Sequence, residues 1–146
     1  MAEIVEFRVT ICEPRKAFLL KQESFSSNLA IKNCLPDDLI HAEFSNNYTA
    51  IVCLAHDPKV DDMALIEALS QSKAFYIGAM GSLKTTKNRL DRLKKFGLSE
   101  FHLQKLKAPI GINIHSKTPQ EIAVSILADL ISHRHEHKLS LNTRQK

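Results

Sequence analysis

The segment Thr49–Ala55 is apolar almost throughout and has polar residues on both sides. A continuous apolar run of this length is typical of a strand that is covered on both faces, as in parallel sheets. Further strands are predicted at Phe7–Cys12, Leu29–Cys34 and Ala74–Ile77, and Pro109–Ile114 is predicted to be a last strand or extended segment. The chain therefore has to bury a sheet between layers of helix.

Helical patterns lie between and after these predicted strands. Their expected ranges are Asp38–Phe44, a helix opened by Asp61 and Asp62, Leu83–Phe96, Ser99–Leu106 and a helix from Thr118 to about His135. Alternating strands and helices predict a single α/β domain over residues 1–146, with three layers, a mostly parallel sheet and a flexible tail at residues 139–146. Ligands of such sheets usually bind at the carboxyl ends of the strands.

Two of the predicted helices carry clear end signals. The first long helix is expected to have Ser82 as its N-cap, Gly97 as its stop and Leu83 on its buried stripe. The last helix begins with Thr118, a proline and Glu121, which together form a capping box.

Composition restricts the class of protein. The 146 residues are 44% hydrophobic and 25% charged, as in ordinary globular domains, and no apolar run approaches the ~20 residues of a membrane span. No signal-peptide pattern is visible, so we expect a cytoplasmic protein without a membrane partner. A net charge of +4 permits nucleic-acid binding, but only 6% of residues are aromatic, so no nucleic-acid partner is expected. Cys12, Cys34 and Cys53 lack metal-site spacing and are expected to be buried free thiols.

The most specific local feature is the stretch Tyr76–Ser82, which predicts a strand, a Gly-x-x-Gly turn and a capped helix. Gly78 and Gly81 would let the backbone approach a ligand, and the free amides at the helix start would favour an anion such as phosphate. Lys84 is the best placed side chain for direct anion contact. A tight turn that needs glycine only for its backbone angles is an equal alternative.

Three further polar features are candidates for a site. The loop His56–Lys59 follows a buried strand, where a histidine beside an aspartate could act as acid, base or ligand, or could simply fix the loop. Glu13 ends the first predicted strand, where a dinucleotide fold holds a ribose hydroxyl. The helix after the glycine turn is basic, and its charges are expected to form a solvated face or a steering patch for an anionic partner. These charges are Lys84, Lys87, Arg89, Arg92, Lys94 and Lys95.

Taken together, several segments resemble the C-terminal Rossmann-like domain of the xanthine dehydrogenase accessory protein family, the XdhC/CoxI-like proteins. They are Ala55–Asp62, Tyr76–Ser82 and Ala108–Ile114, the last followed by Thr118–Ala128. Val9–Arg15 resembles the second strand of the family, with a glutamate where aspartate is usual. The order and spacing of these segments make the resemblance specific.

The resemblance implies a non-catalytic molybdenum-cofactor chaperone. Such a protein binds the cofactor, supports replacement of its oxo ligand by sulfur and delivers it to a xanthine-dehydrogenase-type enzyme. By matched motif the cofactor would be framed by the loop at residues 56–59, the glycine turn and residues 109–111, with the pterin phosphate at the turn. The residues so implicated are His56, Asp57, Lys59, Gly78, Gly81, Ser82, Lys84, Pro109 and Gly111. No catalytic residue and no metal ligand is expected.

The implied fold is Rossmann-like, but the usual first strand and its Gly-x-Gly-x-x-Gly loop have no counterpart among residues 1–146. That strand is central in the usual order, so we expect a gap in the sheet, closed by its neighbours or filled by a second chain. A homodimer is the expected result. Without the phosphate loop an intact NAD(P) site is not expected, although an NAD(P)-dependent oxidoreductase domain remains the alternative.

Overall fold

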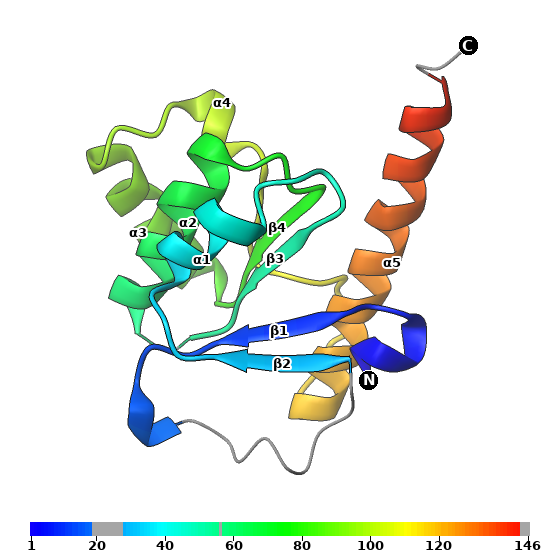
Figure 1. Cartoon of the computed structure of the whole chain (residues 1–146). Helices are drawn as coiled ribbons and strands as arrows, with labels where there is room; N and C mark the ends of the chain where they lie inside the picture. The colour runs from blue at the N-terminus through cyan, green and yellow to red at the C-terminus, as the bar shows by residue number, and fades with distance from the viewer. Residues whose placement is uncertain (19–27, 56, 144–146) are drawn as a thin grey trace.

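The computed structural model describes residues 1–18, 28–55 and 57–143 (Figure 1). Its strands are β1 (Val9–Cys12), β2 (Leu29–Lys32), β3 (Ala50–Cys53), β4 (Tyr76–Ala79) and β5 (Leu106–Lys107). Its helices are α1 (Pro36–Glu43), α2 (Pro58–Gln71), α3 (Leu83–Lys95), α4 (Glu100–Leu103) and α5 (Pro119–Thr143), with short 3₁₀ turns η1 (Ala2–Val5) and η2 (Lys16–Phe18). The order of elements confirms the α/β prediction.

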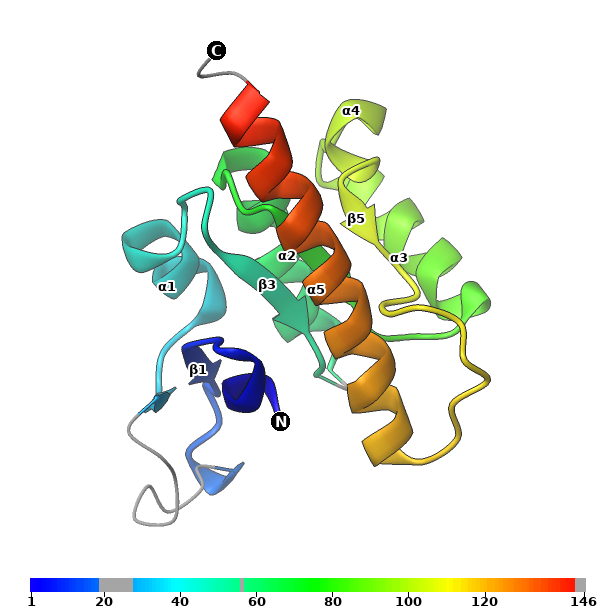
Figure 2. The ribbon, with the colours of Figure 1, turned by 90° about the vertical axis from the view of Figure 1, so that its right-hand side faces the viewer.

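All strand pairs are parallel, but in the described part of the chain they form two sheets rather than one. β1 pairs with β2, so that Val9 lies opposite Leu29, and the second sheet has the order β3-β4-β5. Figures 1 and 2 both place β1 between β2 and β3. The expected gap in the sheet is therefore present, and it lies between β1 and β3.

Helices cover both faces of the three-stranded sheet. α2 packs on β3 and β4 from one side, with α1 and α3 against it, and α5 packs on β4 from the other side. Figure 2 shows α5 in front of β3 and α2 behind it. The larger core cluster, around Leu65, Leu69 and Leu93, fills the α2 side, and a smaller cluster around Tyr76 and Leu130 fills the α5 side. These layers confirm a three-layer, Rossmann-like arrangement.

Several predicted boundaries were wrong at the ends of elements. α2 begins at Pro58, because Asp57 accepts a hydrogen bond from the Lys59 amide and the proline fits the first helical position. α5 continues to Thr143, well beyond the expected end, since neither glycine nor proline interrupts that stretch. The predicted buried position of Leu83 was also wrong, because this side chain is 79% exposed.

The strands differ from their predicted ranges as well. β4 begins at Tyr76 and includes Gly78, so the first glycine of the expected turn lies inside a strand. The last strand is formed by Leu106 and Lys107, whereas residues 109–114 form no strand. Among the described residues no helix is long and apolar enough to cross a membrane.

Candidate functional site

A cavity of about 480 Å³ lies at the carboxyl ends of β3 and β4, beside the first turns of α3. Its size is within the range of small-molecule sites, and its position is the one that ligands prefer in open α/β sheets. The lining residues are Ala55, Pro58, Asp61, Met80, Gly81, Thr85, Asn88, Arg89 and Arg92. The cavity therefore combines the strand ends, the start of α2 and the basic face of α3.

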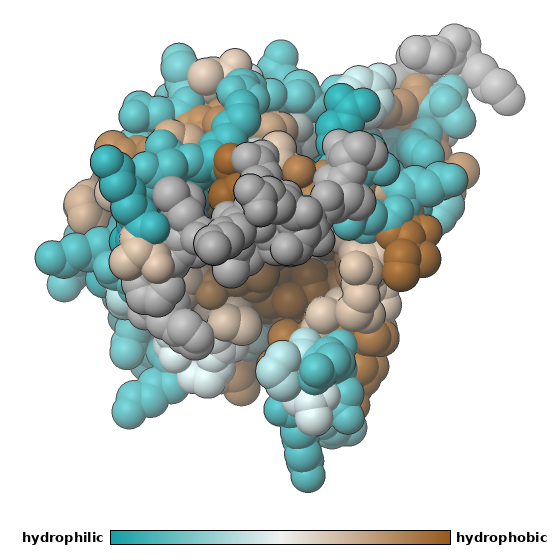
Figure 3. Space-filling model, turned by 60° about the horizontal axis from the view of Figure 1, so that its bottom comes forward, coloured by the Kyte–Doolittle hydropathy of each residue, from teal (hydrophilic) through white to brown (hydrophobic). Residues whose placement is uncertain are grey.

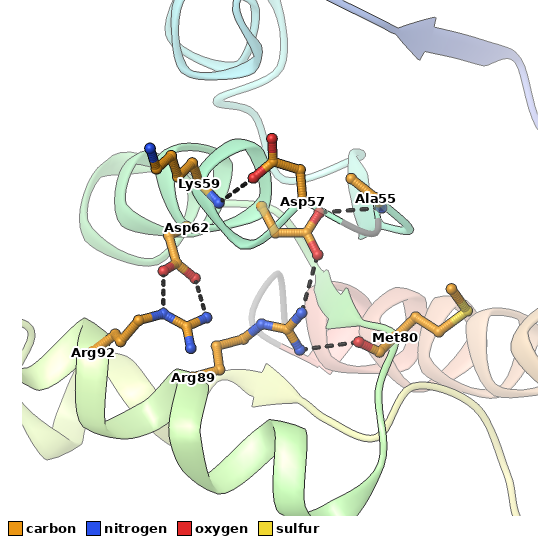
Figure 4. Close-up of polar contacts among 8 residues, drawn as sticks. Ala55, Asp57, Lys59, Asp62, Met80, Arg89 and Arg92 are labelled. Atoms are coloured by element: carbon orange, nitrogen blue, oxygen red, sulfur yellow. Dashed lines mark hydrogen bonds and ion pairs between the residues drawn. The ribbon is translucent and has the colours of Figure 1, made fainter. Parts of the chain in front are cut away.

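One buried guanidinium joins the three elements around this cavity. Arg89 donates from Nη2 to Asp61 Oδ2 over 3.0 Å and from Nη1 to the Met80 carbonyl over 3.0 Å. Asp61 Oδ1 in turn accepts the Ala55 amide at 3.2 Å, so the ends of β3 and β4 are tied to α2 and α3 (Figure 4). The prediction of a solvated side chain was wrong for Arg89, which is 3% exposed. The sequence has Asp61 and Asp62 at one predicted helix start and Arg89 and Arg92 on the next predicted helix, but nothing in it showed that the two pairs face each other.

A second ion pair, between Arg92 and Asp62, lies beside the ion pair of Arg89 and Asp61. Arg92 donates from Nε and Nη2 to the two carboxylate oxygens of Asp62, at 2.6 and 3.0 Å (Figure 4). Paired hydrogen bonds of this kind are stronger and more directional than single ones, and the contact raises the pKa of Arg92 above its ordinary range. Both arginines of the cavity lining therefore have aspartate partners on α2.

The second part of the predicted glycine turn lies at this cavity. Ser82 Oγ accepts the Thr85 amide at 3.1 Å, which confirms Ser82 as the N-cap of α3. Gly81 lines the cavity, and a Cβ there would meet Thr85 Cγ2 at 3.1 Å. Lys84 is exposed in the first turn of α3 and is not part of the cavity lining.

Gly78, by contrast, faces the segment that leads into α5. A Cβ at Gly78 would come within 2.6 Å of the Ile110 side chain, so glycine allows this segment to pack on β4. The Ile110 amide donates to the Ala79 carbonyl at 3.1 Å, while Pro109 is exposed. Gly111 has a φ of +88°, and a Cβ there would meet the Ile126 amide nitrogen of α5 at 3.1 Å. Gly78 and Gly111 thus serve packing contacts of this segment with β4 and α5, and none of Gly78, Pro109 and Gly111 lines the cavity.

The predicted loop after β3 is only partly described. His56 lies outside the described residues, so its expected role stays a prediction. Asp57 caps α2 through its bond to the Lys59 amide at 2.9 Å, and the Lys59 side chain is exposed. Among the described residues of this loop, 57–59, only Pro58 belongs to the cavity lining.

Glu13 is held by a neighbouring side chain. Arg15 donates from Nε to one carboxylate oxygen at 2.8 Å and from Nη2 to the other at 2.9 Å. This contact lowers the pKa of Glu13. Both oxygens that a ribose would need are therefore engaged within the chain.

The three cysteines differ in burial, whereas the sequence predicted that all of them would be buried. Cys53 is buried as expected, and burial raises the pKa of its thiol to about 12. Cys12 and Cys34 are only half-buried, with their sulfur atoms 3.7 Å apart. Burial and the contact with Cys34 raise the pKa of Cys12 to about 12, which disfavours the reactive thiolate.

Sequence reasoning missed a polar cluster that fixes α5 on β4. The Tyr76 hydroxyl donates to Asp129 Oδ2 at 2.6 Å, and His133 Nδ1 lies 3.3 Å from Asp129 Oδ1. Burial and the contact with Asp129 raise the pKa of Tyr76. Because the partners are more than fifty residues apart, only the strand residue Tyr76 could have suggested a buried polar contact.

Three relatives each match half of this chain or more. It is 28% identical over 118 residues to the uncharacterized protein YqeB of Escherichia coli (strain K12), which covers 81% of this chain and 19% of that protein. It is 34% identical over 86 residues to the molybdenum cofactor insertion chaperone PaoD of the same strain, which covers 59% of this chain and 27% of the relative. It is 36% identical over 73 residues to a protein of Bacillus subtilis (strain 168) described as a probable xanthine dehydrogenase subunit, covering 50% of this chain and 20% of that protein.

A solved structure supports the same relationship. The crystal structure of a xanthine dehydrogenase from Bacillus halodurans superposes with a TM-score of 0.73 at 25% identity, over 92% of this chain and 38% of that chain. This chain thus spans well under half the length of each of these relatives. The family model of the XdhC Rossmann domain matches residues 1–130. The chain therefore belongs to the XdhC family, through its Rossmann domain.

Proposed function

We propose that this chain acts in the maturation of a xanthine-dehydrogenase-type molybdoenzyme, as a protein that holds the molybdenum cofactor and passes it on without catalysing a reaction. The observation that carries the proposal is the cavity at the carboxyl ends of β3 and β4. Membership of the XdhC family supports it, as does a relative described as a molybdenum cofactor insertion chaperone.

The residues around the cavity fit the chemistry of a pterin that carries a phosphate. The first-turn amides of α3 suit the phosphate, because the positive end of a helix favours anions. Gly81 leaves room for a close approach of the backbone, and Lys84 lies on the same turn. Asn88 offers both a donor and an acceptor toward the cavity, as the edge of a pterin requires.

In the recipient enzyme the cofactor supplies a redox-active molybdenum centre. In the proposed role this chain binds, orients and shields the group. The buried pair of Arg89 and Asp61 would keep the two strand ends at a fixed separation, so that the cavity is formed before the cofactor enters. We include two further points in the same proposal. The chain supports the exchange of an oxo ligand of the cofactor for sulfur, and it acts in the cytoplasm.

The alternative of an NAD(P)-dependent oxidoreductase is weaker. It requires a glycine-rich phosphate loop, which residues 1–146 do not contain, and a free acidic side chain for the ribose. Glu13 is instead bonded to Arg15.

Equilibrium binding of isolated molybdenum cofactor under anaerobic conditions tests the proposal, with NADH measured in parallel. Asn88→Asp places a negative charge at the cavity and should weaken cofactor binding at least tenfold, about 1.4 kcal/mol. Asn142→Asp makes the same change on an exposed position of α5 and should leave binding unchanged. Equal binding by both variants, or binding of NADH in place of the cofactor, would contradict the proposal.

The expected homodimer also stays a proposal. The outer edges of the two sheets, at β2 and β5, support it, because these edges are unpaired among the described strands and an unpaired edge is a template for another chain. Sedimentation equilibrium at micromolar concentrations should then give twice the chain mass of 16.5 kDa. If the measured mass is that of one chain across that concentration range, the homodimer proposal is wrong, while the cofactor proposal is unaffected.

A further inference from the structure

Two strand edges face the gap in the sheet. In the described part of the chain, β1 pairs only with β2, and β3 pairs only with β4. The Val9 amide donates to Asn28 and the Glu13 amide to Lys32, so the odd-numbered residues of β1 face β2. Because successive backbone groups of a strand point to opposite sides, the N–H and C=O groups of Thr10 and Cys12 face away from β2, toward the gap.

The same alternation holds for β3. The Cys53 carbonyl accepts the Met80 amide at 2.9 Å, so the odd-numbered residues of β3 face β4. The backbone groups of Ala50 and Val52 therefore face the gap from the other side. We call the interval between these two edges the strand slot. Since β1 and β3 both belong to parallel sheets and their chains run in the same direction in Figure 1, one strand parallel to both would complete both ladders.

The two sheets on either side of the slot differ in how far their strands are buried. Every residue of β4 is buried, whereas no residue of β1 or β2 is buried, although most of them are apolar. No residue of either strand belongs to the core clusters of the described chain. Parallel sheets normally have both faces covered. Figure 3 shows a hollow with a hydrophobic floor on the side of the molecule where β1 and β2 lie in Figure 1.

The two sides of the slot are held together without the missing strand. α1 follows β2 and packs on α2, which covers the second sheet. On the other side, Arg134 of α5 donates to the Val5 carbonyl at 3.0 Å and lies 4.6 Å from the centre of the Phe7 ring. Contacts on both sides therefore fix the segment before β1, and the helix after β2, against the larger sheet.

We propose that the strand slot binds one extended polypeptide segment, parallel to β1 and β3, that comes from outside residues 1–146. The segment should be about four to six residues long, the usual length of a strand, and apolar on the side that meets the hydrophobic floor of the hollow. The greater length of the relatives, of which this chain spans 19–38%, supports such a source.

A second copy of this chain fits the slot less well. Each described strand is already paired with a neighbour in its own chain, so a copy could pair with one edge of the slot but could not fill it without unfolding one of its own sheets. A single inserted strand would form hydrogen bonds with the slot-facing backbone groups of four residues at once, those of Thr10, Cys12, Ala50 and Val52. The proposal does not depend on cofactor binding, because the slot and the cavity have different linings.

Amide hydrogen exchange of the full chain tests the proposal. The probe is an acetylated ten-residue peptide of alternating valine and threonine with a lysine at each end, used free at millimolar concentration and tethered to Met1 through a glycine–serine linker. The tether holds the peptide at an effective concentration in the millimolar range, so that weak pairing is still detected. The amides of Thr10, Cys12, Ala50 and Val52 should exchange at least tenfold more slowly with the peptide.

Two variants distinguish slot binding from unspecific adhesion. Thr10→Pro removes a slot-facing N–H while leaving the β1–β2 ladder intact, and it should weaken peptide binding at least tenfold. Thr10→Val keeps the N–H and should bind like the native chain. Protection at only one edge, or at neither edge even in the tethered form, would overturn the proposal. Slow exchange of these four amides without peptide, in a chain that sediments as a dimer, would also overturn the proposal. A second copy of the chain would then occupy the slot.

Discussion

Among single residues, Arg89 has the most consequential position near the cavity. Its side chain is 4% exposed and that of Asp61 3% exposed, so both charges have left water. Burial raises the pKa of Asp61, and the Arg89 guanidinium acts in the opposite direction. A buried pair of this kind is stable only while both partners are present, because each removes the penalty of burying the other.

Asp61→Asn should therefore destabilise the protein by about 3–5 kcal/mol, the range measured when one partner of a buried ion pair is removed. Urea unfolding followed by circular dichroism measures the change. The double variant Asp61→Leu with Arg89→Met leaves no unpaired charge and should lose less stability than Asp61→Asn alone. Additive losses from the two sites would show that the pair is not coupled.

The sequence could not reveal Arg89 as a buried residue. Five of the other twelve residues of α3 are lysine or arginine, a pattern that is usual for a solvated face. Burial depends on the approach of α2, whose Asp61 is 28 residues away. Ser82 was predicted correctly because an N-cap needs only its own helix start. Lining residues such as Asn88 were missed for the same reason as Arg89.

At the scale of elements, α5 shows how local signals gave correct helix starts. Thr118 and Glu121 were predicted as a capping box, and the structure confirms it. Glu121 Oε2 accepts the Thr118 amide at 2.9 Å and the Lys117 amide at 2.7 Å, while the Glu121 amide donates to Thr118 Oγ1 at 3.2 Å. Strand ends were predicted less well, because a strand ends where its partner ends. β5 is the clearest case, since Leu106 and Lys107 are a strand only through pairing with β4.

The capping box predicts a pH-dependent effect on stability. The backbone bonds from Thr118 and Lys117 lower the pKa of Glu121 below its ordinary value of 4.5. The ionised carboxylate therefore stabilises the fold above pH 4.5, and this contribution disappears as the pH falls through the lowered pKa. Glu121→Gln should lower the melting temperature at about pH 7 but not at about pH 2.5.

Thermal melts by circular dichroism at both pH values measure this difference. Glu136→Gln makes the same substitution near the other end of α5 and should not lower the melting temperature at neutral pH. A Glu121→Gln deficit of the same size at both pH values would show that the carboxylate charge has no part in capping.

At the scale of the whole molecule, the sequence predicted a gap in the sheet, and the structure shows how the chain accommodates it. The neighbouring strands do not close up. They remain in two parallel sheets, and helices connect the sheets on both sides. Which strands stay half-exposed could not be deduced from hydropathy, because Val9–Cys12 and Ala50–Cys53 are both apolar segments. The difference arises from the layers that cover each sheet.

The two sheets of the free chain should consequently differ in local stability. The Val9 amide donates to Asn28 and the Met80 amide to Cys53, each at 2.9 Å, so the two bonds are matched in length and differ in their surroundings. Segments with few buried apolar contacts open at a lower free energy than the core. Val9 should therefore exchange its amide hydrogen at least tenfold faster than Met80, which corresponds to about 1.4 kcal/mol.

Native-state hydrogen exchange at increasing urea concentration separates local from global opening. Met80 should exchange only through unfolding of the whole chain, while Val9 and Glu13 should share a smaller opening with a weaker urea dependence. Equal opening free energies at Val9 and Met80 would mean that α1 and α5 alone bind the two sheets into one cooperative unit. In that case the half-exposed apolar strands β1 and β2 would be stable without any further cover.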